Sequence, residues 1–218
     1  MLKDRMEQLK KEIIEFSLHV EKMIENSIEG LLKKDEKALS KIITEDEPIA
    51  NQYENKIDEA CIATIAQFEP RAKDLRTVIM IPKMNNDLER IGDLAVNIVE
   101  SALYLIKRPE VKPLIDIPRM AKTTIGMLKD AIDSFMKEDV EKAKDVCQRD
   151  EIVDSLRDQI LRELVVFMIS DPQTIERSIH LIRISRSLER AADLSTNIAE
   201  DVIFMAEGKV VKHTKKAV

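Results

Sequence analysis

Glycine and proline are scarce in this sequence, whose 218 residues include only four glycines and seven prolines. Sheet proteins rich in hairpins need turn residues at every corner, whereas long helices need few. Tryptophan is absent and aromatic residues make up 3% of the chain, which disfavours a stacking surface for single-stranded nucleic acid. A formal net charge of −6 provides no positive field for phosphates. We therefore predict an all-α protein without a nucleic-acid partner.

Cysteine and histidine are also rare, and neither is spaced for a familiar catalytic site. Cys61 and Cys147 lie far apart, without the spacing of a zinc site or a disulfide framework, and fit a reducing cytosol. None of the three histidines stands in the Glu-x-x-His spacing of a carboxylate-bridged di-iron bundle. The sequence has no Gly-x-Ser-x-Gly turn and no glycine-rich phosphate loop. We predict a protein that is not an enzyme, with no catalytic residues.

The chain also lacks a long uncharged segment. Charged residues begin at Lys3, so no signal peptide is expected, and no stretch of about 20 apolar residues could span a bilayer. Hydrophobic residues nevertheless make up 44% of the chain, which is enough for a folded core beneath its 35% of charged residues. We expect a cytoplasmic protein that reaches a membrane only through protein partners.

Apolar residues at steps of three and four predict six long helices. Their expected ranges are about 2–31, 39–68, 73–106, 120–137, 140–170 and 174–207. Gly30, with the polar cluster that follows it, is expected to end the first helix. Pro48 is expected to kink or restart the second helix, and Pro82 to bend the third. Three prolines at 109, 113 and 118 mark a linker, because proline and the residue before it both disfavour helix.

The two halves of the chain repeat each other. Residues 87–100 and 187–200 are identical at eight of fourteen positions, which indicates a duplication with an offset of 100 residues. Each unit, near 105 residues, is of a normal size for an independent core. We predict two pseudo-symmetric three-helix bundles. The expected divisions are a first bundle at 1–108, a Pro-rich linker at 109–118, a second bundle at 119–208 and a polar tail at 209–218.

The repeated segment carries a stripe of oxygen-bearing side chains. At about 100° per residue, these side chains share one narrow face of each helix. The stripe consists of Asn86, Glu89, Asp93, Asn97 and Glu100 in the first copy and of Glu189, Asp193, Asn197 and Glu200 in the second. Carboxylates four residues apart stand one turn apart, where both can bind a hard cation. A face that is only solvated is usually interspersed with lysine, yet none occurs between Lys83 and Lys107 or between Lys144 and Lys209.

A metal site on these stripes needs oxygens from a second helix. Candidate pairs four residues apart are Glu47 with Asn51, Glu54 with Asp58, and Asp150 with Asp154, although each pair alone also fits an exposed face. Oxygen ligands suit Mg, Mn, Ca or Fe, whereas Zn and Cu prefer His or Cys. The cofactor we expect is a divalent or iron cation (Fe, Mn or Mg). The expected ligands are Glu89, Asp93, Glu189, Asp193, Asp150 and Asp154, with Glu47, Asn51, Asn97 and Asn197 as weaker candidates. Arg90 and Arg190 are expected to pair with neighbouring carboxylates or to contact an anion.

On these motifs the sequence resembles the PhoU family, the accessory and regulatory proteins of phosphate-specific transport. The resemblance covers almost the whole chain. It is carried by residues 53–61, 74–76, 88–93 and 188–197. The family motif, Glu or Asp followed four residues later by Asp, is matched by Glu89 with Asp93, by Glu189 with Asp193 and by Asp150 with Asp154. Asn51 stands where the motif has Asp, so we expect weaker metal binding in the first bundle than in the second.

The resemblance implies more than the residues show by themselves. It implies two similar three-helix bundles, metal ions or iron clusters at the paired motifs, and a cytoplasmic homodimer. It also implies negative regulation of the phosphate-starvation response through contacts with the transporter ATPase and a sensor histidine kinase. From the residues alone, two other classes stay open: a carboxylate-bridged metal oxidase that handles oxygen, and a metal-free helical scaffold.

Overall fold

The computed structural model describes residues 1–207; the expected tail at 209–218, with His213, lies outside the described residues. Its α-helices are α1 (Leu2–Lys33), α2 (Glu36–Lys41), α3 (Glu47–Phe68), α4 (Ala72–Leu105), α5 (Asp116–Lys137), α6 (Val140–Ser170) and α7 (Ile175–Glu207). Residues 1–207 contain no β-strand, and the prediction of an all-α fold with two three-helix bundles is confirmed. No helix within this range combines the length and the apolar character needed to cross a membrane.

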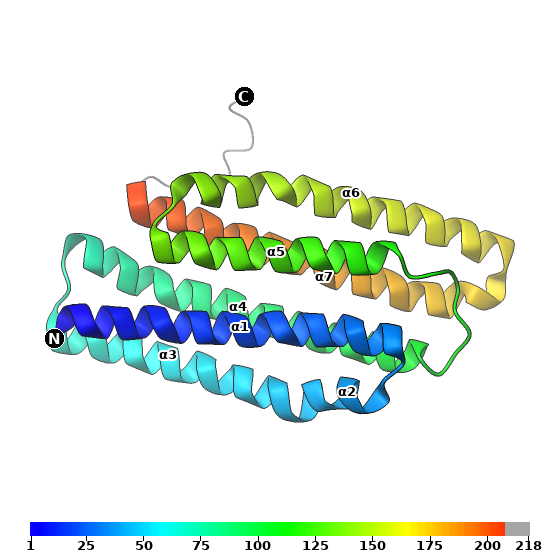
Figure 1. Cartoon of the computed structure of the whole chain (residues 1–218), viewed down its shortest axis with the longest axis horizontal. Helices are drawn as coiled ribbons and strands as arrows, with labels where there is room; N and C mark the ends of the chain where they lie inside the picture. Colours follow the sequence, from blue (N-terminus) through cyan, green and yellow to red (C-terminus); the bar gives the residue numbers. More distant parts are fainter. Residues whose placement is uncertain (208–218) are drawn as a thin grey trace.

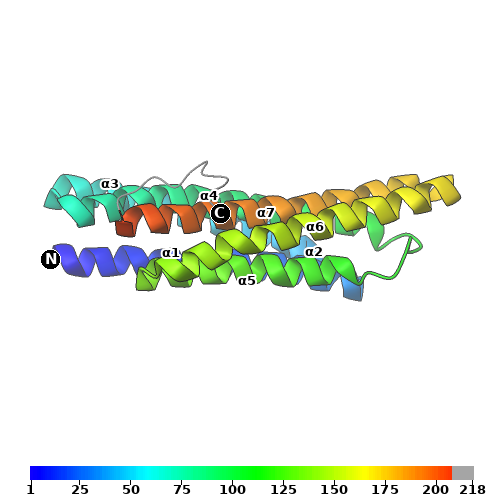
Figure 2. The ribbon, with the colours of Figure 1, turned by 90° about the horizontal axis from the view of Figure 1, so that it is seen from above.

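The two halves lie side by side, with the second half shifted along the bundle relative to the first (Figure 1 and Figure 2). In Figure 1 the first half, α1 to α4, lies below the second half, α5 to α7. Figure 2 shows α1 and α5 in one layer and α4 and α7 in another. Each layer therefore contains helices from both halves (Figure 2), and α4 packs on α7 as α1 packs on α5.

The halves share one hydrophobic core. Leu88 and Ile98 of α4 and their duplicates Leu188 and Ile198 of α7 are fully buried, and the buried apolar residues of both halves belong to one cluster. Positions 81–90 and 181–190 follow the same order of buried, half-buried and exposed residues, so the duplication persists in the packing. The expectation that each unit has an independent core is wrong, because the α4–α7 and α1–α5 contacts join the two units.

The same turn ends the first helix of each half. Lys34 (φ 56°) and Glu138 (φ 55°) adopt the left-handed conformation that closes many helices. The next residue is aspartate in both turns, and its carboxylate accepts hydrogen bonds from backbone N–H groups of the following helix. Asp35 caps α2 at 3.1 and 3.0 Å, and Asp139 caps α6 at 3.0 Å. Two hydrogen-bonded caps thus set the reversal of the chain in each half.

The first helix ends within the expected polar cluster, at Lys33, and not at Gly30 itself. The glycine allows a close approach instead, since a Cβ atom there would lie 2.7 Å from Cδ2 of the buried Leu39 on α2. Leu39 therefore fills the space that a larger residue at position 30 would take.

Pro48 marks a restart in the second expected helix. A π-helical turn at Ile42–Asp46 joins α2 to α3, and Pro48 lies in the first turn of α3, where its missing N–H costs least. His19 of α1 donates a hydrogen bond to the carbonyl oxygen of Asp46 across 2.8 Å. The predicted restart is thus accompanied by a cross-helix contact. In contrast, α4 continues through Pro82.

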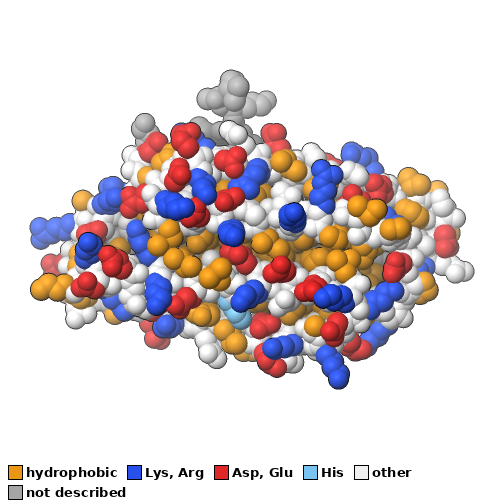
Figure 3. Space-filling view, in the orientation of Figure 1, with side chains coloured by type: hydrophobic (Ala, Val, Ile, Leu, Met, Phe, Trp, Pro, Cys, Tyr) orange, Lys and Arg blue, Asp and Glu red, His pale blue; other side chains and the backbone are white. Residues whose placement is uncertain are grey.

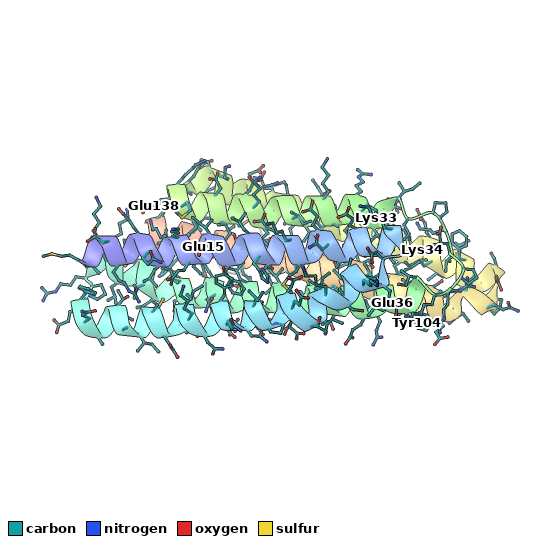
Figure 4. The ribbon with its side chains drawn as sticks, turned by 60° about the horizontal axis from the view of Figure 1, so that its bottom comes forward. Glu15, Lys33, Lys34, Glu36, Tyr104 and Glu138 are labelled. Carbon is teal, nitrogen blue, oxygen red and sulfur yellow. The ribbon has the colours of Figure 1, made fainter. Side chains whose placement is uncertain are left out.

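Ion pairs fasten the segment between the halves. Because α4 ends at Leu105 and α5 begins at Asp116, the connection begins and ends three residues before the expected linker, and Pro118 lies in the first turn of α5. Lys112 pairs with Asp116 of α5 and with Glu163 of α6. Lys34 pairs with Glu110 across 2.8 Å at the same end of the bundle, while Lys73 pairs with Glu138 across 2.5 Å at the other end. Figure 4 shows Lys34 and Glu138 at these opposite ends.

We expect Gly30→Ala to lower the free energy of unfolding by about 1–3 kcal/mol, because the new methyl group must displace Leu39. Gly126→Ala is the matched control, since the nearest atom to its added Cβ lies at 3.9 Å and alanine favours helix. Urea titrations of both variants measure the difference. Equal or greater stability of Gly30→Ala would show that this close approach does not constrain position 30.

Candidate functional site

The acidic stripe of α4 lies on the side of the helix opposite the core. Leu88, Ile91 and Ile98 are fully buried, whereas Asp93 and Asn97 are exposed and Glu89 is half-buried. The predicted orientation of the repeated segment is therefore correct. Because Glu89 is only partly covered, it faces the neighbouring helix of its own half as well as solvent.

Four carboxylates meet in the first half. Glu54 and Asp58 of α3 lie beside Glu89 and Asp93 of α4, close enough for Glu54 to interact with both aspartates and for Glu89 to hydrogen-bond with Asp93. Asn85 of α4 connects the two helices. Its fully buried amide donates to the backbone oxygen of Glu54 at 2.8 Å and to Oδ1 of Asp58 at 2.9 Å. We call Glu54, Asp58, Glu89 and Asp93 the first-half cluster.

Basic groups do not neutralise the first-half cluster. Within residues 1–207, none of its four carboxylates has a lysine, arginine or histidine nitrogen within 4.0 Å. Burial, followed by repulsion from Asp58 and Asp93, raises the pKa of Glu54. Burial, followed by repulsion from Asp93, also raises the pKa of Glu89, although Arg90 lowers it slightly. Both shifts indicate a site where negative charge accumulates without a partner.

The duplicated carboxylates of the second half surround an arginine. Nη1 of Arg157, on α6, lies 3.0 Å from Oδ1 of Asp154 and 2.5 Å from Oε1 of Glu189 on α7. Nη2 lies 2.9 Å from Oδ1 of Asp158. Glu189 corresponds to Glu89 at the offset of 100 residues, and Asp154 corresponds to Asp58 at an offset of 96, where the burial pattern of α3 recurs in α6. We call these three carboxylates with Arg157 the second-half cluster.

Asp150, another predicted ligand of the second half, lies near Cys147, as does Glu200 of the acidic stripe. Glu200 and Asp150 are the charged groups that, after burial, raise the pKa of the Cys147 thiol to about 11. Burial likewise raises the pKa of Cys61 to about 12, with Asp58 as the next cause. Both cysteines are free, in agreement with the sequence. Each thiol of the metal-free chain is therefore protonated at neutral pH.

The weaker candidates do not join either cluster. The side chains of Glu47, Asn51 and Asn97 make no hydrogen bond or ion pair within the described part of the chain. Asn197 lines a polar hollow between α4 and α7 instead. Arg90 lies 3.9 Å from Asp87, which is a loose pair, and Arg190 has no carboxylate within 4.0 Å in residues 1–207.

The first-half cluster fits a hard cation in the type and number of its oxygens. Carboxylate oxygens on two facing helices are the ligands that Mg, Mn and Fe prefer. In residues 1–207, however, no three Asp, Glu, His or Cys side chains converge as ligands of one ion. An ion bound here requires rotation of these partly exposed side chains. The first-half cluster therefore supplies the ligand oxygens, and a bound ion would bring these oxygens together.

Sequence reasoning missed Arg157 and Asp158 of the second-half cluster, and Asn85 beside the first-half cluster. Arg157 escaped notice because the charge pattern was assessed from lysines on the striped helices, whereas this arginine comes from α6. Asn85 lies next to the stripe but on the buried side, and the only sequence signal was a polar residue among apolar ones. Glu54 and Asp58 were recognised as a pair, but Glu47 and Asn51 were ranked above them.

Two repeated three-helix units, each with carboxylates between its last two helices, define a tandem helical-bundle protein. Comparison with known families agrees, since the PhoU domain matches residues 13–102 and again 117–202. The chain belongs to the PhoU family. The resemblance noted from the sequence is thereby confirmed.

Relatives and solved structures match over nearly the full length. A phosphate-specific transport system accessory protein PhoU homolog of Aquifex aeolicus is 37% identical, covering 95% of this chain and 94% of the relative. Homolog 2 of Thermotoga maritima is 34% identical, with 97% and 90% covered. The crystal structure of PhoU from Pseudomonas aeruginosa superposes with a TM-score of 0.91 at 33% identity, covering 96% of this chain and all of that one. The two units and their arrangement are thus shared with the family.

Glu89→Gln and Glu189→Gln should change stability in opposite directions in metal-free buffer. Glu89→Gln removes repulsion and raises the melting temperature at pH 8, whereas Glu189→Gln takes a carboxylate from Arg157 and lowers it. A raised folded-state pKa means that Glu89 is protonated more easily in the folded chain. The gain from Glu89→Gln therefore shrinks as the pH falls through that pKa. Thermal melts at pH 8 and pH 5 measure both effects; shifts of the same sign at pH 8 would contradict the assigned surroundings.

Proposed function

We propose that this protein is an accessory protein of phosphate-specific transport that restrains the phosphate-starvation response. The observation that carries the proposal is the match of both repeated units to the PhoU domain, with relatives named as accessory proteins covering about the whole chain. A structure described as a phosphate transport system regulatory protein, from Streptococcus pneumoniae, supports it at a TM-score of 0.89 and 25% identity. The role is that of a non-enzymatic adaptor, in keeping with the words accessory and regulatory in those names.

The proposed partners are the ATPase of the phosphate transporter and a sensor histidine kinase, met in the cytoplasm by a homodimer. Two surfaces have the apolar character that protein partners need. Exposed apolar side chains gather on α6 and α7 near their connection: Leu161, Val165, Val166, Phe167, Ile169, Ile175 and Ile179. A groove between α1 and α5 is lined by Ile28, Leu32, Pro118 and Ile125, and Figure 3 shows an apolar band along the middle of this face. Contiguous exposed apolar surface is typical of interaction sites.

Metal binding is the second part of the proposal. The first-half cluster offers four carboxylates with no basic partner in residues 1–207, and an added cation would offset their mutual repulsion. The bound ion would draw α3 and α4 together on one side of the bundle. We propose a divalent or iron cation there, Fe, Mn or Mg, with Glu89 and Asp93 as ligands from α4.

Deletion of the gene in its host should derepress phosphate-uptake genes several-fold in phosphate-rich medium. The physical reason is the loss of the adaptor that links the transporter to the kinase. Reporter expression in the deletion strain, with and without a plasmid copy of the wild-type gene, measures the effect. An unchanged reporter level in the deletion strain would refute the regulatory role.

Metal content should depend on the first-half cluster. We expect wild-type protein incubated with Mn²⁺ to retain metal after gel filtration, and Glu89→Ala combined with Asp93→Ala to lose at least half of it. The reason is that two of the four carboxylates are gone. Elemental analysis per chain measures the metal. The matched control is Glu7→Ala combined with Glu15→Ala, which removes the same charge from exposed positions of α1. Equal losses of bound metal in both double variants would show that the metal responds to the overall negative charge of the chain and not to a specific site.

A further inference from the structure

The two acidic clusters differ in what neutralises them. Two carboxylates of each set correspond. Glu89 matches Glu189 at the offset of 100 residues, and Asp58 matches Asp154 at an offset of 96, because residues 52–60 and 148–156 follow the same order of buried, half-buried and exposed positions. The second-half set already holds a cation, the guanidinium of Arg157, within 2.5 to 3.0 Å of all three carboxylates. The position that corresponds to Arg157, at the offset of 96, is Cys61, a buried residue without a basic group. The first half therefore has no equivalent cation in its chain.

A second difference concerns the residue that holds the outer aspartate. In the first half the buried amide of Asn85 donates to Asp58, and its own Oδ1 is buried without a hydrogen-bond partner. In the second half the corresponding residue is Ser185, whose hydroxyl donates to the Ile182 carbonyl oxygen of its own helix at 2.9 Å. The buried oxygen of Asn85 has no hydrogen-bond partner and lies beside carboxylates that no basic group neutralises. Together these oxygens are a set of metal ligands that lacks a cation. The second half leaves no such atom at the matching position.

We propose that Arg157 takes the place of a metal ion in the second half, so that only the first half binds an exogenous cation. The proposal rests on the metal binding proposed above and reverses the ranking expected from Asn51. The guanidinium nitrogens of Arg157 lie within 3.0 Å of the carboxylate oxygens that a metal ion would need. The side chains of Arg157 and Glu189 are only 29% and 18% exposed. A metal ion would have to displace a tethered cation from three carboxylates and then remain beside its charge.

This arrangement gives Arg157 a role in specificity. It excludes metal from one of two duplicated sites and, at the same time, holds α6 against α7 through Glu189. Arg157 thus always bridges α6 and α7, whereas only an ion from solution would bridge the carboxylates of α3 and α4. Any effect of cations on this protein is then confined to α3 and α4.

The test uses the whole chain and Mn²⁺ alone as the probe. Mn²⁺ per chain is measured by equilibrium dialysis and elemental analysis for the wild type, for Arg157→Gln, and for Arg157→Gln added to Glu89→Ala with Asp93→Ala. Arg162→Gln is the control, because Arg162 is an exposed arginine of the same helix with no ion pair in residues 1–207. Circular dichroism confirms that each variant keeps its helices.

We expect Arg157→Gln to raise bound Mn²⁺ to roughly twice the wild-type amount, since a second set of carboxylates is released, and Arg162→Gln to leave it unchanged. In the background lacking Glu89 and Asp93, Arg157→Gln should restore binding that Glu189→Ala with Asp193→Ala removes again. If folded Arg157→Gln protein binds no more Mn²⁺ per chain than the wild type, the proposal is overturned. A wild type whose metal is lost in Glu189→Ala with Asp193→Ala but kept in Glu89→Ala with Asp93→Ala would also overturn it. If the wild type binds no metal but Arg157→Gln does, the role of Arg157 stands and the proposed first-half site fails.

Discussion

Burial of the apolar sides of α4 and α7 against each other is the constraint on which the rest of the structure depends. Leu88, Leu188, Ile98 and Ile198 are all fully buried in the shared core. With these sides fixed, the helical period leaves the carboxylate-bearing sides of α4 and α7 facing outward, toward α3 and α6. The hydrophobic effect therefore places both acidic clusters, although none of their own carboxylates is fully buried. Electrostatics then decides only how each cluster is neutralised.

Helix positions and the repeat could be predicted from the sequence because they depend on local periodicity. The limits of α6 agree with the expected 140–170, and α7 begins one residue after its expected start. Gly30 was misinterpreted because its role depends on Leu39, which approaches only after the chain has reversed. The site was harder to predict from the sequence because it, too, depends on contacts between helices. Glu89 and Asp93 could be found from spacing along one helix, but the cation beside Glu189 comes from a helix whose rotation no single-helix pattern encodes.

Duplication makes the differences between halves informative. Where Glu89 and Glu189 have kept their type, their surroundings have diverged through residues that do not belong to the motif. Arg157 stands where the first half has the buried Cys61, and Ser185 replaces a bridging amide. Motif matching treats the two copies as equal, because both retain Glu and Asp four residues apart. Charge neutralisation in three dimensions distinguishes them.

The shared core has a consequence for how such a chain could arise. A single three-helix unit in water would expose the apolar side of α4 that α7 now covers, together with the part of α1 that α5 covers. Two identical units can bury both surfaces by associating around a twofold axis, which is the usual symmetry of small assemblies. The tandem chain is therefore equivalent to a dimer whose subunits have been fused. Fusion freed the two copies of one gene segment to change independently, which identical subunits cannot do.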